Sequence, residues 1–269
     1  MDWDDAYANG PHIADADAYP PRWRAAAAVL RGALGQRAVL DQAYGESPRE
    51  KFDLFMPSGP AHGLIVFVHG GYWRAFGKDD WSHLSAGPLA RGWAVAIPEY
   101  SLCPEVRIPE ITRQIGRSIT TAATRVRGPI RLAGHSAGGH LVARMMCEDS
   151  PLENDVKRRI AMAMPISGVH DLRPLLRTKM NDDLRLDEEE AARESPALSV
   201  PACRAPVTCW VGALERPEFI RQNALLANIW TGFGINTLRI EEPDRHHFDV
   251  IDGLTDPDSA LLSTLLAEI

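Results

Sequence analysis

Residues 129–139, PIRLAGHSAGG, decide the fold of this chain. They join an apolar run, residues 129–133, to a helix-forming stretch from Ala137 to Cys147, with Gly-His-Ser-Ala-Gly at the junction. A serine between a strand and a helix, with glycines two places before and after it, is typical of a nucleophile elbow, because a side chain at either glycine would collide in the sharp turn. The pattern therefore predicts that Ser136 presents its hydroxyl as a nucleophile.

A second glycine-containing segment, HGGYW at residues 69–73, directly follows the apolar run 64–68. Glycines at such a turn let the backbone approach a reacting carbonyl and point amide hydrogens at the negative charge that develops on its oxygen. We predict an oxyanion hole formed by the amides of Gly70, Gly71 and Ala137. A turn that only joins a strand to a loop would also explain the glycines, but not their occurrence upstream of an elbow.

Short apolar segments alternate with helical stretches along most of the chain. This alternation predicts the α/β class and, with the elbow, an α/β-hydrolase fold: a mostly parallel central sheet with helices on both faces. The candidate strands are residues 52–56, 64–68, 94–97, 130–133, 160–166, 207–211 and 237–240. The candidate helices are residues 23–34, 80–91, 109–126, 137–148, 217–230 and 256–267.

Two segments lie outside this alternation. Residues 1–45 are rich in Ala, Asp, Pro and Tyr, and we predict an N-terminal arm that packs on a single α/β-hydrolase domain, residues 46–269. Whether the arm closes over the active site is left open. Residues 172–201 are charged and indicate a small insertion before the penultimate strand. A helix beginning at Asp187 explains the run of acids there more simply than a functional patch, because carboxylates stabilise a helix N-terminus.

Ser136 needs a base that removes its proton and an acid that holds the base in one tautomer, since a serine hydroxyl is a poor nucleophile at neutral pH. α/β-Hydrolases supply these groups in the chain order serine, acid, histidine. After the last candidate strand, His246 and His247 are adjacent loop residues, and either imidazole could turn inward. The acid is predicted at Glu215, in the loop after the preceding candidate strand, with Asp171 as the alternative.

Three aromatic residues near these motifs are candidates for lining a substrate pocket: Tyr72, Trp73 and Tyr100. Packing in the core or in loops would explain them equally well. His69 is expected to hold its loop by a hydrogen bond. His135 and His140 are interpreted as packing residues, because no third ligand accompanies them as a zinc site would require.

The composition narrows the classes of function. With 45% apolar residues, 24% charged residues and a net charge of −7, the chain offers no basic surface for nucleic acid. Its N-terminus is acidic, and the longest early apolar run, residues 25–30, is too short to span a membrane, so we expect a cytoplasmic protein without a membrane partner. Four cysteines without C-x-x-C spacing indicate reduced core thiols, and no metal or cofactor is expected. A homodimer is left open.

With these residues in place, residues 45–265 resemble the kynurenine formamidase (arylformamidase) branch of the α/β-hydrolases, a neighbour of the hormone-sensitive-lipase-like esterases. The resemblance is carried by HGGYW at 69–73, GHSAGGHL at 134–141, SGVHDL at 167–172, ERPEF at 215–219 and HF at 247–248. It implies that the acid is Glu215, two residues before Pro-Glu-Phe, and that the base is His247, directly before a Phe. His246 is then a loop residue or a substrate contact.

The chain departs from these relatives in two places. Glu215 stands where formamidases usually carry Asp. Residues 99–105, EYSLCPE, resemble the DYRLAPE stretch of lipase-like esterases, with Glu in place of its first Asp. These departures do not change the prediction of a hydrolase, but they affect the prediction of its exact substrate.

Together these residues predict a cofactor-free serine hydrolase in which His247 deprotonates Ser136 and Glu215 stabilises the imidazolium. The Tyr72-Trp73 pair favours N-formylkynurenine or a related aryl formamide as the substrate, with small aryl or short-chain esters as the alternative. A hydrolase-fold protein that only binds a ligand is a further hypothesis. It is disfavoured because every part of the triad and of the oxyanion hole has a candidate residue.

Overall fold

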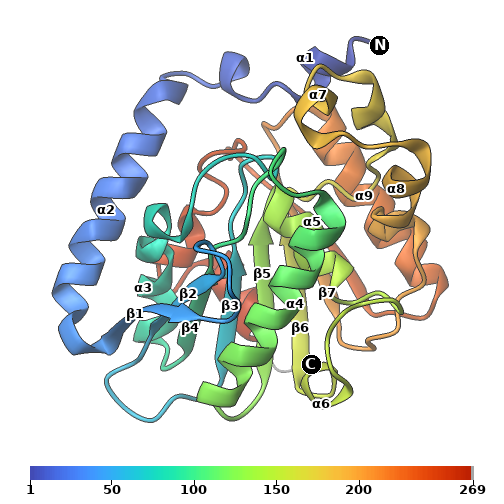
Figure 1. Cartoon of the computed structure of the whole chain (residues 1–269). Helices are drawn as coiled ribbons and strands as arrows, with labels where there is room; N and C mark the ends of the chain where they lie inside the picture. Colours follow the sequence, from blue (N-terminus) through green and yellow to red (C-terminus); the bar gives the residue numbers. More distant parts are fainter. Residues whose placement is uncertain (268–269) are drawn as a thin grey trace.

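Eight strands form one sheet in the computed structural model, which describes residues 1–267 (Figure 1). The strands are β1 (Ala38–Ala43), β2 (Lys51–Phe55), β3 (Leu64–Val68), β4 (Ala94–Pro98), β5 (Ile130–His135), β6 (Ile160–Ile166), β7 (Val207–Gly212) and β8 (Thr237–Glu242). Their order in the sheet is β1-β2-β4-β3-β5-β6-β7-β8. β2 runs antiparallel to both its neighbours, and every pairing from β4 to β8 is parallel.

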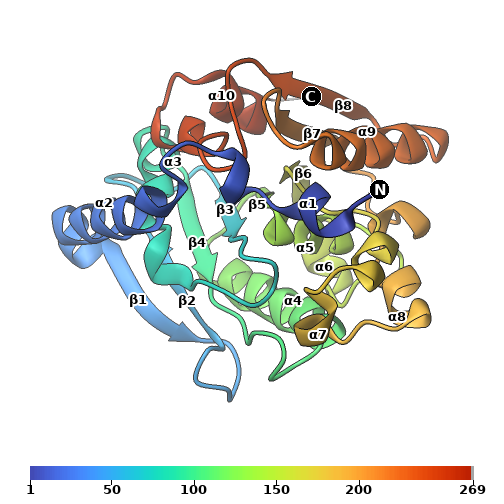
Figure 2. The ribbon, with the colours of Figure 1, turned by 90° about the horizontal axis from the view of Figure 1, so that it is seen from above.

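Helices cover both faces of this sheet (Figures 1 and 2). One face carries α4 (Ile108–Arg125), α5 (Ala137–Arg144) and α9 (Pro217–Gly232), and the other carries α2 (Tyr19–Leu34), α3 (Ala86–Ala90) and α10 (Ala260–Leu266). The shorter helices are α1 (Trp3–Tyr7), α6 (Asn154–Lys157), α7 (Asn181–Leu184) and α8 (Glu188–Arg193). The 3₁₀ turns are η1 (Gly10–His12), η2 (Ala16–Ala18), η3 (Gly35–Arg37), η4 (Lys78–Asp80), η5 (Ser82–Ser85), η6 (Arg173–Arg177), η7 (Pro196–Leu198) and η8 (Asp252–Thr255).

Strand β3 shows how the two faces share one apolar run. Leu64, Val66 and Val68 belong to the core under α4, α5 and α9, whereas Ile65 and Phe67 belong to the core under α2, α3 and α10. Successive side chains of a strand point to opposite faces of its sheet, so a strand covered on both sides must be apolar throughout. All five residues are accordingly buried.

The predicted mostly parallel sheet with helices on both faces and the seven candidate strands are confirmed, with β3 and β6 at their predicted ends. The sequence did not predict β1. This edge strand contains Asp41 and Gln42, and its side chains are exposed or half-buried, so its sequence lacks the apolar run of the central strands. The predicted arm of residues 1–45 therefore includes one strand of the sheet.

Two helix predictions had different outcomes. The stretch 80–91 is α-helical only from Ala86 to Ala90, and Ser82–Ser85 forms a 3₁₀ turn. Pro88 has no amide hydrogen to donate to the carbonyl four residues before it, so a continuous α-helix through this stretch would lack that bond. In the insertion, α8 begins directly after Asp187, whose carboxylate accepts a hydrogen bond of 2.8 Å from the Glu190 amide. The run of acids there is therefore a capped helix start, as predicted.

The parallel strands place the predicted motifs at one edge of the sheet. The oxyanion segment follows β3, the elbow follows β5, and the segments containing Asp171 and Glu215 follow β6 and β7. Carboxyl ends of parallel strands are where open α/β sheets bind ligands. Viewed from above this edge, the N-terminal segment with α1 crosses over it before the chain continues into α2 (Figure 2).

Candidate active site

Ser136 occupies the turn between β5 and α5. Its backbone has φ 56° and ψ −116°, a conformation that costs free energy for any residue except glycine. The turn is held by a neighbouring strand, because the Ser136 amide donates a hydrogen bond of 2.8 Å to the Ile166 carbonyl. Ala137 is the first residue of α5, and the first amides of a helix have no acceptor within it. The Ala137 amide is therefore available to a ligand beside Ser136.

The oxyanion loop, residues 69–73, passes against this turn. A Cβ added to Gly70 would lie 3.0 Å from the Ser136 Cβ and 2.9 Å from the backbone oxygen of His135, so a larger residue would displace the loop. The His69 Nδ1 donates a hydrogen bond of 2.7 Å to the Gly70 carbonyl. Since C=O and N–H point in opposite directions in a trans peptide, this bond also directs the Gly71 amide away from His69. His69 thus has the loop-holding role expected from the sequence.

Glu215 and His247 form a buried pair at the ends of β7 and β8. The His247 Nδ1 donates a hydrogen bond of 2.6 Å to Glu215 Oε2, and the two side chains are 4% and 0% exposed. Glu215 Oε1 accepts hydrogen bonds from the Ser167 hydroxyl at 2.5 Å and from the Gly212 amide at 2.9 Å. The carboxylate is therefore fixed on three sides. It holds the His247 proton on Nδ1 and leaves Nε2 able to accept another.

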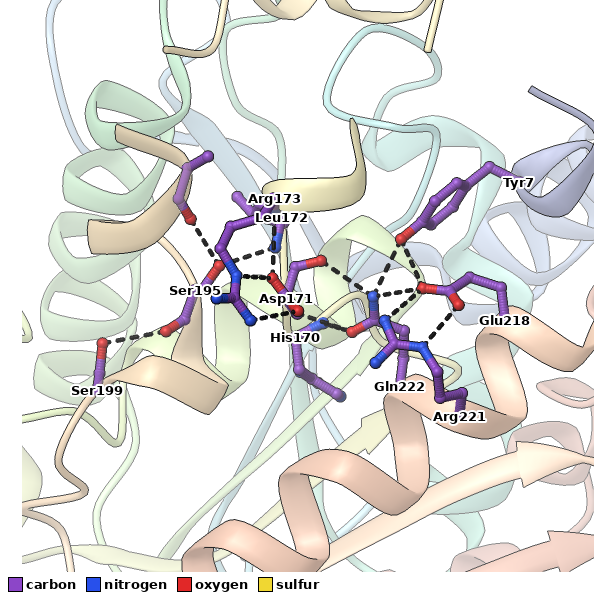
Figure 3. Close-up of polar contacts among 11 residues, drawn as sticks. Tyr7, His170, Asp171, Leu172, Arg173, Ser195, Ser199, Glu218, Arg221 and Gln222 are labelled. Carbon is purple, nitrogen blue, oxygen red and sulfur yellow. Dashed lines mark hydrogen bonds and ion pairs between the residues drawn. The ribbon is translucent and has the colours of Figure 1, made fainter. Parts of the chain in front are cut away.

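Asp171, the alternative acid, is engaged elsewhere. Its carboxylate accepts hydrogen bonds of 2.9 and 3.0 Å from the Arg173 guanidinium (Figure 3). Burial raises the pKa of the Asp171 carboxyl, but the bonds from Arg173 outweigh burial and hold the pKa below its usual range. Of the two candidate acids, Glu215 is the one that contacts a histidine.

His246, the alternative base, also turns elsewhere. Its Nε2 lies 3.0 Å from the Tyr19 hydroxyl, and its backbone amide donates to the Asp249 carboxylate at 2.7 Å. Its ring packs edge-on against Tyr19, with 5.4 Å between centroids. His246 therefore attaches α2 to the last loop, whereas His247 lines a cavity together with Ser136 and its ring lies 4.6 Å from that of His135.

A cavity of about 450 Å³ contains both Ser136 and His247 in its lining. The oxyanion loop and the N-terminal segment supply much of the remaining wall. Its aromatic lining residues are Tyr7, Trp23, Tyr72, Phe76, Trp81 and Phe248. The ionisable residues of the lining, histidines apart, are Asp4, Tyr7, Tyr72, Arg74 and Lys179. The arrangement suits an aromatic substrate whose carbonyl reaches Ser136.

Of the predicted substrate-binding aromatics, Tyr72 lines this cavity, whereas Trp73 and Tyr100 do not. Both are fully buried. Trp73 packs edge-on against His140 at 5.1 Å, and Tyr100 stacks on His69 at 4.3 Å and donates to the His69 carbonyl at 2.9 Å. These two side chains support the oxyanion loop from behind, contrary to the prediction that they line the pocket.

Sequence reasoning missed two groups of residues at the site. Ser167, which donates to Glu215, belongs to a motif that the sequence identified without a role; its place directly after β6, beside β7, could have suggested one. The second group is six residues of the N-terminal arm, from Asp4 to Pro11, that line the cavity; the sequence left open whether the arm covers the site and pointed to none of these residues. No local pattern in that segment distinguishes a cavity wall from a surface coil.

Burial keeps His69 and His135 neutral. It lowers the pKa of His69 to about 4 and that of His135 well below its usual value. The His135 Nε2 donates a hydrogen bond of 2.9 Å to the His247 carbonyl, and the two rings lie 4.6 Å apart. A neutral His135 therefore adds no positive charge beside the His247 ring.

Within residues 1–267, no group of three or more His, Cys, Asp and Glu side chains is placed to hold a metal ion. The four cysteines are free and buried. None of the helices in this described range is long and apolar enough to cross a bilayer.

Comparison with known proteins finds relatives that share the α/β-hydrolase fold. The family model for the alpha/beta hydrolase fold matches residues 65–225. Kynurenine formamidase from Danio rerio is 31% identical over 243 residues, which cover 87% of this chain and 82% of the relative. Kynurenine formamidase from Drosophila melanogaster is 30% identical, covering 80% of this chain and 76% of the relative.

Solved structures extend the comparison. A protein from Silicibacter sp. TM1040, proposed to be a thioesterase, is 51% identical and superposes with a TM-score of 0.96 over 99% of this chain and 100% of that one. The esterase LipW from Mycobacterium marinum shares the fold, with a TM-score of 0.71 at 18% identity over 98% of this chain and 94% of that one.

Proposed function

We propose, from the premise that this chain belongs to the kynurenine formamidase family of α/β-hydrolases, that it is a serine hydrolase removing the formyl group from an aryl formamide such as N-formylkynurenine. The observation that carries the proposal is the buried hydrogen bond between His247 and Glu215 at a cavity that Ser136 also lines. A serine, an imidazole and a carboxylate in this relation form the constellation of acyl-transfer enzymes.

In the proposed mechanism, His247 Nε2 takes the proton of Ser136 as its oxygen attacks the formyl carbon. The amides of Gly70, Gly71 and Ala137 donate to the resulting oxyanion. The carbon–nitrogen bond then breaks, and the arylamine leaves with the proton held by His247. Water, deprotonated by the same imidazole, attacks the formyl-enzyme, and formate leaves as Ser136 recovers its proton.

The cavity lining supports an aromatic substrate with a charged tail. Six aromatic residues surround the space beside Ser136, which suits an aryl ring. Arg74 and Lys179 offer cations and Asp4 a carboxylate in the same lining. The amino-acid group of N-formylkynurenine carries one charge of each sign, whereas a simple ester carries neither.

A second candidate is the hydrolysis of esters or thioesters. It is favoured by the Silicibacter protein, which is proposed to be a thioesterase, and by the esterases that share the fold. The same triad would serve, because only the leaving group changes from an amine to an alcohol or a thiol.

The experiment is a substrate panel on the purified protein and on Ser136→Ala. We expect loss of N-formylkynurenine absorbance at a kcat/KM well above that for p-nitrophenyl acetate or acetyl-CoA, and no turnover by Ser136→Ala. A fluorophosphonate should label the parent once, at Ser136. Fast ester or thioester turnover without formamide turnover would reject the formamide substrate, and unlabelled but active protein would reject the mechanism.

The proposal also assigns the chain to tryptophan catabolism in the cytoplasm. N-Formylkynurenine is an oxidation product of tryptophan, and the four free cysteines suit a reducing compartment.

A further inference from the structure

The N-terminal segment, residues 3–12, forms part of the cavity wall. Residues from Tyr7 to Pro11 line the same space as Ser136 and His247. In the overall views α1 lies over the carboxyl edge of the sheet, where it contacts α9 and the η6 turn of the insertion (Figures 1 and 2). A segment in this position affects catalysis only if something fixes it there.

Contacts of Asp4 with Lys179 and of Asp5 with Arg216 help to hold the segment, and Tyr7 is its most buried anchor. Its side chain is 1% exposed although it belongs to a five-residue helix. Its hydroxyl donates a hydrogen bond of 2.8 Å to Glu218 Oε1 and accepts one of 3.0 Å from Gln222 Nε2 (Figure 3). Burial raises the pKa of the Tyr7 hydroxyl, so the group stays protonated and can donate.

The partners of Tyr7 are themselves held in place. Glu218 accepts two hydrogen bonds of 2.7 Å from Arg221, on the next turn of α9 (Figure 3). The Gln222 amide oxygen accepts from the backbone amides of His170 and Asp171 at 2.8 and 2.7 Å. The Tyr7 hydroxyl is thus joined to a network that connects α9 with the segment after β6.

This network adjoins the acid and the base. Glu218 lies three residues after Glu215, in the first turn of α9. The next residue, Phe219, packs against the Tyr7 ring at 5.9 Å and against the His247 ring at 4.4 Å. The Tyr7 side chain therefore contacts the helix that begins two residues after Glu215 and one ring that packs against His247.

The backbone of Tyr7 is bonded to the opposite side of the site. The Tyr72 hydroxyl donates a hydrogen bond of 2.5 Å to the Tyr7 carbonyl and accepts one of 3.3 Å from Asn9 Nδ2. Tyr72 directly follows Gly71 in the oxyanion loop and has a positive φ of 50°. A residue with such an unfavourable backbone conformation is held in place by contacts with its surroundings, and the N-terminal segment provides one of them.

We infer that Tyr7 is a positioning residue of this enzyme. It fixes the oxyanion loop relative to the helix that carries Glu218 and Phe219. In this way it sets the geometry between Ser136, His247 and the oxyanion donors. The inference rests on the proposed serine-hydrolase function. It assigns a catalytic contribution to a segment that precedes the first strand and contains none of the reacting groups.

The test uses two full-length variants that each remove one hydroxyl. Tyr7→Phe removes the bond to Glu218 and keeps the ring and the carbonyl, whereas Tyr72→Phe removes the bond to that carbonyl. We expect each to lower kcat by about five- to tenfold with a smaller change in KM, since a single hydrogen bond contributes about that factor. The rate of fluorophosphonate labelling at Ser136 should fall by a similar factor, because labelling uses the same base and oxyanion hole.

Tyr44→Phe is the matched control. Its hydroxyl donates a hydrogen bond of 2.6 Å to the Glu99 carbonyl, its side chain is 9% exposed, and it does not line the cavity. Removing this hydroxyl should lower the melting temperature as Tyr7→Phe does and leave kcat unchanged. If Tyr7→Phe and Tyr72→Phe also lose only stability and retain the parent's kcat and labelling rate, Tyr7 is merely structural and the inference fails.

The failure of the proposed function would look different. A parent protein that neither hydrolyses p-nitrophenyl acetate or N-formylkynurenine nor reacts with the fluorophosphonate would overturn the function and, with it, this inference. An active parent with unaffected tyrosine variants overturns the inference alone.

Discussion

The elbow and the N-terminal segment meet at the same cavity but are held there in different ways. At the elbow the backbone itself is packed: a Cβ added to Gly138 would lie 1.9 Å from the Val68 carbonyl oxygen. In the N-terminal segment the corresponding atom on Gly10 would lie 4.0 Å from its nearest neighbour, the Ala16 Cβ, which is ordinary contact. One region is positioned by backbone packing and the other by side chains, so the same substitution should affect them differently.

The largest expected effect is that of Gly138→Ala compared with Gly10→Ala. The first forces β3 and α5 apart, and we expect it to cost more than about 4 kcal/mol of unfolding free energy or to prevent folding. The second should change stability by about 0.5 kcal/mol or less. Urea unfolding followed by circular dichroism measures both. A Gly138→Ala protein as stable as Gly10→Ala would show that the elbow tolerates a side chain where the structure leaves no room.

The next effect separates the two acids that follow β6 and β7. Glu215→Gln keeps the size of the side chain but no longer stabilises the His247 tautomer that can accept a proton, so kcat should fall by about 10³ to 10⁴. Asp171→Asn, which loses only its pair with Arg173, should leave kcat within about threefold of the parent. Steady-state kinetics with one substrate decide the matter. The assignment of Glu215 is contradicted if the Asp171 variant is the more damaged.

A third prediction concerns acid stability, which should depend on the core and not on the N-terminal segment. Burial lowers the pKa of His69 to about 4 and those of His140 and His170 to about 3. Their pKa in the unfolded chain is about 6.5, so the unfolded state binds more protons below that pH. The stabilisation is present above pH 6.5 and is lost as pH falls toward the folded values. Protonation of these three residues should lower the free energy of unfolding by up to about 4 kcal/mol for each unit by which the pH falls.

Melting temperatures between pH 7.5 and 5 measure this loss. His170→Leu is the informative variant, because neither ring nitrogen of His170 has a hydrogen-bond partner among the described residues. It should reduce the pH dependence by about a fifth, because burial also lowers the pKa of His83 and His135. Ala8→Gly, in the N-terminal segment and without a titratable group, is the control and should leave the dependence unchanged. Equal slopes for the parent and His170→Leu would mean that this histidine is protonated in the folded protein.

The same contrast explains what the sequence could predict. Buried strands and the elbow can be predicted from local sequence. An apolar run indicates a strand covered on both faces, and a glycine two places from a serine indicates a turn without room for a side chain. The pair of Glu215 and His247 followed from the order in the chain and from the family resemblance, and the structure adds their contact. The role of Tyr7 had no such signal, because it depends on a partner about 200 residues away. For Ser167 the only signal was its place after β6, beside the strand that precedes Glu215.

The smallest expected effect tests whether the N-terminal segment and the insertion together bind the charged part of the substrate. Asp4 accepts a hydrogen bond of 2.7 Å from the Lys179 backbone amide, so the N-terminal segment holds the part of the insertion that presents the Lys179 side chain to the cavity. Lys179→Ala should raise KM for N-formylkynurenine about three- to fivefold and leave KM for uncharged p-nitrophenyl acetate unchanged, because an exposed ion pair contributes about 1 kcal/mol or less. Arg177→Ala, an exposed cation nearby that does not line the cavity, is the control. If Lys179→Ala raises KM similarly for both substrates, Lys179 shapes the cavity wall and does not bind a charge. If Arg177→Ala raises KM as much as Lys179→Ala does, the net charge of the insertion attracts the substrate from a distance.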